Sequence, residues 1–328
     1  MPIQTAIDSI NNNQGSPYGF KNRIINGQMQ IAQRATSNTI TAAATIAAGY
    51  STVDRFYVYS TGANVTAAQV AGSGATKNRL QITGAASVTA VGIGQRIEAS
   101  NSYDLAGSTA TLSADLAISA TLTTVTWTAS YANTADTFGT VSSNTNTQIA
   151  TGTFTVTPTV TNFNAQITIP AAATTGIQIL FTVGALTAGL TWTVGNVQLE
   201  KGSTATSFEY RSTGTELALC QRYYAKVGPA VSGAYPGFGT AGGESSTAAF
   251  GIFNTPVTMR SLPTFSSSGT LSLYSSVFSN ITSFATAYYT NNTVAININV
   301  ASGLTLGRFY MILANNDTAA FVQFSSEL

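Results

Sequence analysis

The residue types that carry most protein chemistry are scarce in this chain. Its 328 residues include no histidine and a single cysteine, Cys220. Without histidine the commonest general base is missing, and so are Ser-His-Asp triads, Cys-His pairs and most zinc sites. One cysteine also excludes an internal disulfide and a multi-cysteine metal site. The sequence therefore predicts no nucleophilic hydrolase, no metal and no cofactor, and it predicts that Cys220 is a small buried residue.

Carboxylates are the remaining candidates for acid–base chemistry. A glycosidase needs two of them facing each other across a cleft. The acids between residues 18 and 212 show no diagnostic spacing; they are Asp54, Glu98, Asp104, Asp115, Asp136, Glu200 and Glu209. Three have a basic neighbour in the sequence, namely Glu98 (Arg96), Glu200 (Lys201) and Glu209 (Arg211). We expect structural ion pairs here and no catalytic residue, with polysaccharide cleavage as the less favoured alternative.

Binding a sugar without cleaving it asks for less than catalysis does. It needs an aromatic face on which a pyranose ring can stack, and amides or hydroxyls that fix the orientation of the ring. Tyrosines and a tryptophan lie near predicted turns in the first two hundred residues, at Tyr50, Tyr57, Tyr59, Tyr103, Trp127 and Tyr131. A second group lies near the carboxyl end, at Tyr235, Phe238, Tyr274, Tyr288 and Tyr289. These are the candidate carbohydrate-binding residues, and for each the alternative is a core or interface position.

The composition of the chain favours some classes of binding partner over others. Only 8% of the residues are charged, 44% are hydrophobic, and the net charge is +1. A chain with so small a net charge produces no electrostatic field that would attract a polyanion, so nucleic-acid binding is not expected. Uncharged surfaces can be buried against identical neighbours without desolvating ions, which favours self-association. No run of about 20 apolar residues and no signal-peptide pattern is visible, so we expect no membrane insertion and synthesis in a cytoplasm.

Residues 18–212 show the period of two that is typical of half-buried strands. Alternating apolar residues are found at Leu112–Ile118, Phe154–Val160, Ala165–Ile169 and Ile177–Val183. The inward parity switches between Val194 and Val197, which predicts a bulge at Gly195-Asn196. Turn residues separate the runs and no helical pattern lies between them, so the sequence predicts an antiparallel jelly-roll sandwich. No charge lies between Asp136 and Glu200, and the unprotected strand edges would be covered by neighbouring subunits or by loops.

The rest of the chain divides into three further segments. Residues 1–17 predict a short arm whose Ile3, Ile7 and Ile10 share one helical face and attach to a particle, with a frayed terminus as the alternative. Residues 213–227 predict a helical connector that presents Leu217, Cys220, Tyr223 and Tyr224 to other copies in a homotrimer. Residues 228–328 predict a second, smaller β-domain. Its stretch 237–242 matches the dinucleotide fingerprint literally, but it follows a helix in a Gly/Ser-rich passage, so we interpret it as a loop.

Several segments occur in an order that resembles a family of tail-fibre-like and virion structural proteins of marine phages and cyanophages. They are GFKNRIINGQM at 19–29, QR at 33–34, YSTVDRF at 50–56, QRIE at 95–98, LAGSTATLS at 105–113, VQLEKG at 197–202, FE at 208–209 and ELALCQRYY at 216–224. The first domain also resembles a carbohydrate-binding-module jelly roll. The resemblance covers residues 19–226 and assigns no catalytic residue.

What the resemblance implies is a component of a virus particle. The expected protein is a tail fibre or appendage subunit that attaches to host-surface glycans, is a homotrimer, and contacts other virion proteins through its arm. The alternative is a capsid or tail decoration protein with no receptor-binding role.

Overall fold

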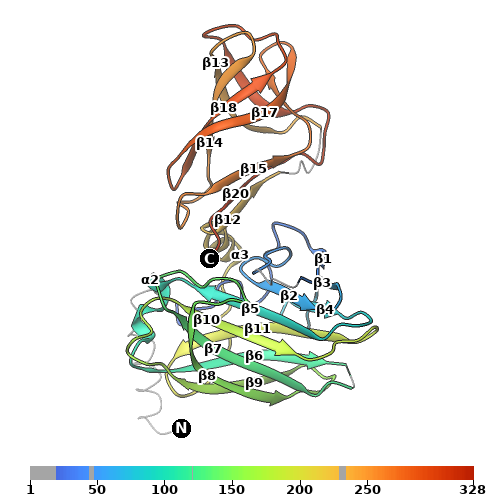
Figure 1. Ribbon diagram of the computed structural model, residues 1–328, viewed down its shortest axis with the longest axis vertical. Coiled ribbons are helices and arrows are strands. Elements are labelled where there is room, and N and C mark those ends of the chain that lie inside the picture. The colour runs from blue at the N-terminus through green and yellow to red at the C-terminus, as the bar shows by residue number, and fades with distance from the viewer. Residues whose placement is uncertain (1–19, 44–47, 120, 229–233) are drawn as a thin grey trace. The chain divides into compact units, whose positions relative to one another are not determined.

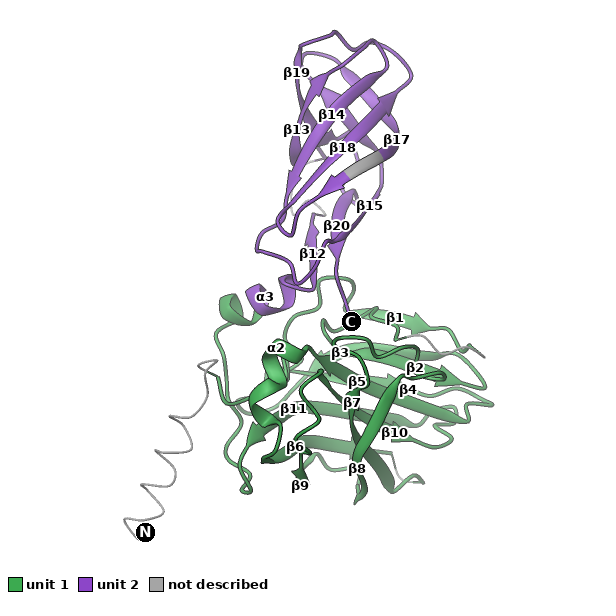
Figure 2. Cartoon of the chain, turned by 60° about the vertical axis from the view of Figure 1, so that its left-hand side comes forward, with its two compact units in different colours: residues 1–216, 328 green, residues 217–327 purple. Residues whose placement is uncertain are grey.

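The computed structural model describes residues 20–43, 48–119, 121–228 and 234–328 (Figure 1). The chain forms two compact units, coloured separately in Figure 2. Unit 1 contains residues 1–216 with Leu328, and unit 2 contains residues 217–327. The predicted division into arm, jelly roll, connector and second domain remains a prediction, and the arm residues Ile3, Ile7 and Ile10 lie outside the described residues.

Unit 1 is an antiparallel sandwich of two sheets (Figure 1). The six-stranded sheet has the order β1 (Ser37–Ile40), β3 (Val65–Ala71), β4 (Asn78–Thr83), β11 (Thr191–Lys201), β6 (Thr109–Ile118) and β9 (Thr161–Thr168). The five-stranded sheet has the order β2 (Tyr57–Thr61), β5 (Ala90–Ile97), β10 (Ile177–Val183), β7 (Thr124–Ala132) and β8 (Asn146–Thr155). Two short helices, α2 (Ala99–Ser102) and η1 (Tyr103–Leu105), follow β5. Neighbouring strands are mostly distant in sequence, and this crossing order confirms the predicted jelly-roll sandwich.

The alternating residues build the core between the two sheets. Leu112, Leu116, Ile179 and Phe181 are at most 1% exposed and belong to one continuous apolar cluster. Burial of side chains from both sheets supplies the main stabilising free energy of such a sandwich. The prediction is wrong for Val160, which is 36% exposed in the loop between β8 and β9.

The predicted bulge lies in the middle of β11. The pairing of β11 with β6 shifts between Gly195 and Gln198, and Asn196 has a left-handed φ of 45°. Because one extra residue restores the inward parity, Trp192 and Val197 are both completely buried on the two sides of the shift.

Unit 2 contains a closed barrel and a small three-stranded sheet. The barrel has the order β13 (Gly237–Gly243), β14 (Ala248–Asn254), β18 (Thr293–Val300), β17 (Phe278–Tyr289), β16 (Leu271–Tyr274) and β19 (Phe309–Ala314). The sheet has the order β12 (Tyr224–Val227), β20 (Phe321–Ser325) and β15 (Thr264–Ser268). Ile296, Ile298, Tyr310 and Ile312 lie in the core of this unit. Residues 237–242 form strand β13 and not the predicted loop, because closure of the barrel pairs them on both sides.

The connector helix is shorter than its sequence pattern predicts. Helix α3 (Thr213–Gln221) ends before Tyr223, and Tyr224 pairs with Ser325 on β20. Cys220, Tyr223 and Tyr224 are buried, and only Leu217 of the four predicted interface residues is partly exposed. Pairing with β20 overrides the helical period, so the four side chains do not share one exposed helical face. In the described part of the chain, no helix is long and apolar enough to span a bilayer.

Candidate functional site

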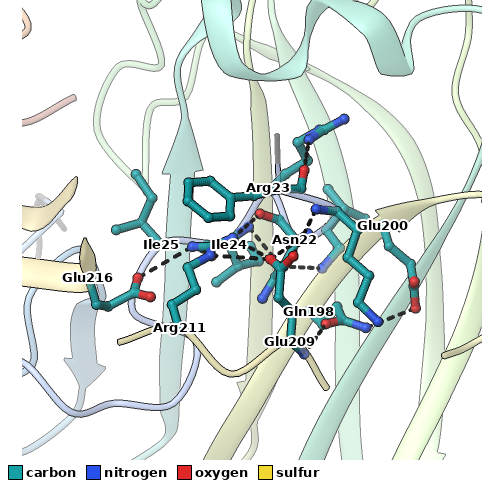
Figure 3. A network of polar contacts seen from close by, with 12 residues as sticks. Asn22, Arg23, Ile24, Ile25, Gln198, Glu200, Glu209, Arg211 and Glu216 are labelled. Carbon is teal, nitrogen blue, oxygen red and sulfur yellow. Dashed lines mark hydrogen bonds and ion pairs between the residues drawn. The ribbon is translucent and has the colours of Figure 1, made fainter. Parts of the chain in front are cut away.

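Arg211 and two carboxylates from the sequence motifs of unit 1, Glu209 and Glu216, form a largely buried network (Figure 3). Arg211 bonds to Glu209 at 3.0 Å and to Glu216 at 3.4 Å, and it also donates to the backbone oxygens of Asn22 and Ile24. Burial of the Arg211 guanidinium is therefore compensated by two carboxylates and two carbonyls.

The same network ties the first described segment to later parts of the chain. Glu209 accepts from the backbone N–H groups of Lys21 and Asn22, and Glu216 accepts from that of Asn26. Burial raises the pKa of Glu216 above its ordinary value, while the Arg211 guanidinium and the Asn26 N–H oppose this shift. Each of these groups already has a hydrogen-bond or ion-pair partner within the fold. We therefore interpret the network as structural, because it holds residues 21–26 against residues 209–216.

The other acids that we considered as catalytic candidates are also engaged. Asp104 pairs with Arg23 at 2.7 Å, Asp115 accepts from Asn162 and Asn196, and Asp136 accepts from the Ala99 N–H. The predicted pair of Glu209 with Arg211 is confirmed. Glu200 accepts from Thr206 and Gln198, whereas Lys201 donates to the backbone oxygen of Asp104. Within the described residues no group of three or more acids or thiols is arranged to hold a metal ion.

A different kind of surface covers the outer side of the five-stranded sheet. Its strand register places Tyr59 opposite Gly92, Gly92 opposite Thr182, Thr182 opposite Thr126, and Thr126 opposite Thr153. These five residues form one row across all five strands, which we call the threonine row. Because residues on the same row of a pleated sheet share a face, the row presents one tyrosine ring, one glycine and three threonine hydroxyls.

The tyrosine ring is held in place by the glycine beside it. A Cβ on Gly92 would lie 2.0 Å from Cε1 of Tyr59, so the ring occupies space that only glycine leaves free. The next row repeats this arrangement, since a Cβ on Gly94 would lie 2.3 Å from Cζ of Tyr57. Tyr59 is half-buried, and burial raises the pKa of its phenol above the ordinary value. The hydroxyl is therefore a hydrogen-bond donor at neutral pH, as it is in an ordinary tyrosine.

An open hollow of about 580 Å³ lies at this end of the face. Its walls come from β2, β5, β7 and β10, from the loop before β7 and from the loop after β10. The lining residues are Tyr59, Ala90, Thr121, Leu122, Thr123, Thr124, Thr126, Thr182, Val183 and Gly184. No lining residue is charged. The hollow therefore combines one aromatic ring with a wall of hydroxyls and a few apolar side chains.

Arg96 covers part of the same face beyond the hollow. Arg96 donates to the side chain of Gln178 at 3.0 Å and to the backbone oxygen of Gly139 at 2.7 Å. Its guanidinium lies 5.5 Å from the ring centroid of Tyr57 and 5.3 Å from that of Phe138. This stacked cation covers Tyr57, which is completely buried and therefore not available to a ligand.

The candidate aromatic residues are distributed unevenly over these surfaces. Tyr57 is completely buried and Trp127 is 6% exposed, so neither offers a ring for stacking and the prediction is wrong for both. Trp127 belongs to the core between the sheets, whereas Tyr57 is buried on the outer side beside Arg96. Tyr131 packs against the core, and Tyr50 packs edge-on against Tyr57. Tyr59 lines the hollow, whereas the 63% exposed Tyr103 lies on η1. In unit 2, Tyr235, Tyr288 and Tyr289 are 51%, 63% and 38% exposed, and their binding role remains a prediction.

The threonines of the hollow were not among the sequence candidates. The signal that could have found them is the pairing of Tyr-Val-Tyr at 57–59 with Gly-Ile-Gly at 92–94, because alternating glycines on a strand mark a close approach by a neighbour. That signal becomes specific only once the two strands are known to be adjacent.

Comparison with known proteins gives structural likeness alone. No protein family and no curated protein matches the chain. A crystal structure described as a putative sugar binding protein from Bacteroides thetaiotaomicron matches with a TM-score of 0.36 at 12% identity, covering 55% of this chain and 100% of that chain. A family 11 carbohydrate-binding module from Clostridium thermocellum, solved with a mixed-linked tetrasaccharide, matches with a TM-score of 0.33 at 14% identity, covering 49% and 97%.

A third likeness is to the enzymatically active domain of tailspike protein 4 from bacteriophage CBA120. Its TM-score is 0.33 at 14% identity, and the match covers 57% of this chain and 22% of that chain. At such identities and TM-scores these likenesses identify no ligand for the present chain.

Proposed function

We propose that this protein is a non-catalytic glycan-binding protein whose jelly-roll unit holds a neutral oligosaccharide on the threonine row. The observation that carries the proposal is the alignment of Tyr59, Thr182, Thr126 and Thr153 across the open end of one sheet face. The ring of Tyr59 supplies an apolar surface for a pyranose ring. The threonine hydroxyls donate and accept hydrogen bonds at successive strands.

The dimensions of the row fit an extended ligand. Strands in a sheet are about 4.8 Å apart, so the four spacings from Tyr59 to Thr153 span about 19 Å. Hydroxyls at regular spacing along this length match a ligand that repeats its own hydroxyls, as an oligosaccharide does.

The lining residues of the hollow carry no charge, and this favours one class of glycan. An acidic sugar bound there would leave its carboxylate or sulfate without a cation, because none of the lining residues is basic. Arg96, on the same sheet face, is already engaged by Gln178 and Gly139. Desolvating an unpaired anion costs several kcal/mol, so a neutral glycan is favoured.

For the whole protein we propose a virion component, a tail fibre or appendage subunit that attaches to host-surface glycans as a homotrimer. The order of the sequence motifs in residues 19–226 and the 8% content of charged residues support this proposal. The alternative, a capsid or tail decoration protein, has no receptor-binding role and predicts that no glycan binds.

The test is a glycan array followed by calorimetric titration of the best neutral oligosaccharide. We expect the affinity to fall about tenfold in Tyr59→Ala. Stacking on one aromatic ring contributes about 1 kcal/mol, and burial of the apolar area of the ring adds to this. We expect about a fivefold loss in Thr182→Val, which removes one hydroxyl at almost constant shape.

Tyr103→Ala is the matched control, because Tyr103 is an exposed tyrosine of the same unit that does not line the hollow. Its affinity should equal that of the wild type. Absence of any neutral ligand, or an equal loss in Tyr103→Ala and Tyr59→Ala, would overturn the proposal.

A further inference from the structure

The outer side of the six-stranded sheet holds an arginine that the network around Arg211 does not include. Arg79 on β4 is only 7% exposed, and its neighbour Leu80 lies in the apolar core on the other side of the strand. Because successive side chains of a strand point to opposite faces, Arg79 lies on the outer face of the sheet. A buried cation in such a place needs a counter-charge and complete hydrogen bonding.

The aliphatic stem of Arg79 lies across the bulge in β11. A Cβ on Gly195 would lie 2.9 Å from Cγ and 3.4 Å from Cδ of Arg79, so only glycine leaves room for this stem. Gly195 pairs with Asp115 on β6, and the bulge residue Asn196 follows it in the chain. The bulge therefore determines where the arginine lies and which polar groups are near it.

The guanidinium of Arg79 has too few partners within the fold. Its Nη1 and Nη2 atoms both donate to one acceptor, Oγ of Ser73, at 3.3 Å, which is longer than a typical N–H···O bond. Its Nε atom is buried and has no hydrogen-bond partner among the described residues. Arg79 also forms no ion pair with any described carboxylate. A guanidinium carries five N–H donors, so most of the donors and the charge itself remain unmatched.

The acid beside Gly195 is already used by other groups. Asp115 accepts from Asn162 at 3.0 Å through one oxygen and from Asn196 at 2.8 Å through the other. Asn196 also donates to the Thr76 hydroxyl at 2.6 Å, whereas its own side-chain oxygen is buried without a hydrogen-bond partner in the described part of the chain. The region of the bulge therefore contains an unpaired buried cation and an unpaired buried acceptor.

The hairpin turn between β3 and β4 contacts both of these groups. Ser73 binds the guanidinium, Thr76 binds Asn196, and the Thr76 N–H donates to the Ser73 carbonyl at 3.1 Å. Lys77 is exposed, and because it lies two residues before Arg79, it is on the same side of the strand. The turn thus presents one exposed and one buried cation on the same side. Ser73 is also exposed, and two long hydrogen bonds are its only hold on the arginine, so a ligand can displace it.

We propose that this turn is a second ligand site, which binds an acidic sugar through its carboxylate or sulfate group. The oxyanion pairs with Arg79 and is attracted by Lys77, and a hydroxyl of the same sugar donates to the side-chain oxygen of Asn196. A water molecule would offer hydrogen bonds to the same atoms but no counter-charge. An inorganic anion would supply the charge but no donor for Asn196. The site goes beyond the proposed function, since no residue that lines the hollow is charged.

The test is calorimetric titration of the full-length chain with galacturonate and with galactose 6-sulfate, which distinguishes a carboxylate from a sulfate. Galactose and inorganic sulfate are the comparison ligands. We expect at least one acidic sugar to bind about tenfold more tightly than either of them, because only an acidic sugar satisfies both unpaired groups. Arg79→Met should lower that affinity about tenfold or more, since it removes the charge and keeps an unbranched stem. Lys201→Met is the matched control, because it removes an exposed cation at the far end of β11 and should leave the affinity unchanged.

Three outcomes of the titration overturn the proposal. The first is that neither acidic sugar binds more tightly than galactose. The second is that inorganic sulfate binds as tightly as the acidic sugars. The third is that Arg79→Met and Lys201→Met have the same affinity for the acidic sugar.

The stability of the protein without ligand gives a second readout. Replacing an unpaired buried cation by an apolar side chain is neutral or stabilising. The urea midpoint of Arg79→Met, followed by tryptophan fluorescence, should therefore equal or exceed that of the wild type. A lower midpoint would mean that the fold itself compensates the guanidinium, and the proposal would then be wrong. Tyr59→Ala should keep the affinity for the acidic sugar and Arg79→Met that for the neutral glycan, so this proposal and the glycan proposal fail independently.

Discussion

The ring of Tyr59 occupies the volume in which any residue other than glycine at position 92 would place its Cβ. The two residues are directly paired across β2 and β5, and the hypothetical Cβ would lie 2.0 Å from Cε1 and 2.4 Å from Cζ of the ring. Tyr59 is the one aromatic residue in the lining of the hollow. The aromatic surface of the candidate site therefore depends on a glycine that contributes no side chain of its own.

Gly92→Ala should weaken glycan binding as much as Tyr59→Ala does. The added methyl group displaces the tyrosine ring, and overpacking of this kind costs about 1–3 kcal/mol of stability. Calorimetric titration of both single variants and the double variant gives a thermodynamic cycle. We expect Gly92→Ala to cause no further loss of affinity once Tyr59 is alanine. Fully additive losses would show that the glycine acts on binding by another route.

Asn196→Ala should destabilise unit 1 more than Asn196→Gly does. Both variants lose the hydrogen bonds from the Asn196 side chain to Thr76 at 2.6 Å and Asp115 at 2.8 Å. Only alanine adds strain at a φ of 45°, where the left-handed conformation costs about 1–2 kcal/mol. Urea unfolding followed by tryptophan fluorescence reports on unit 1 alone, since Trp127 and Trp192 are the two tryptophans of the chain. Equal midpoints for the two variants would show that strain at the bulge is negligible.

The stability of the wild type relative to Glu216→Gln should fall as the pH rises from 4 to 7. Burial raises the folded-state pKa of Glu216, so the unfolded chain releases this proton at lower pH than the folded chain does. The stabilisation is complete below the unfolded pKa of about 4.3 and is lost as the pH rises through the higher folded value. Glutamine keeps an oxygen to accept from the Asn26 N–H and does not titrate. Unfolding midpoints of both proteins at pH 4 and 7, measured by tryptophan fluorescence, test this; a relative stability that rises with pH would reverse the assigned direction.

The predicted helical interface shows how far sequence periodicity reaches. Leu217, Cys220 and Tyr224 share one face of an ideal helix, so the pattern predicted an interface there. The helix ends at Gln221 because Tyr224 finds a better partner in β20, a strand almost one hundred residues away.

The sequence by itself determined the jelly-roll class, the buried parity of β6, β10 and β11, and the bulge at Gly195-Asn196. These features follow from short-range alternation, which depends only on which side of a strand each residue faces. It also determined the scarcity of charged residues.

Tertiary structure alone decided which aromatic residues reach solvent and which residues form the row across the sheet. Tyr57 and Tyr59 have the same parity on one strand, yet one is buried beside Arg96 and the other lines an open hollow. The order of the five strands brings Thr182 and Thr126 into line with Tyr59, although they are far apart in the chain. Neither fact can be predicted from the local sequence pattern, because each depends on the register between strands that are far apart in the chain.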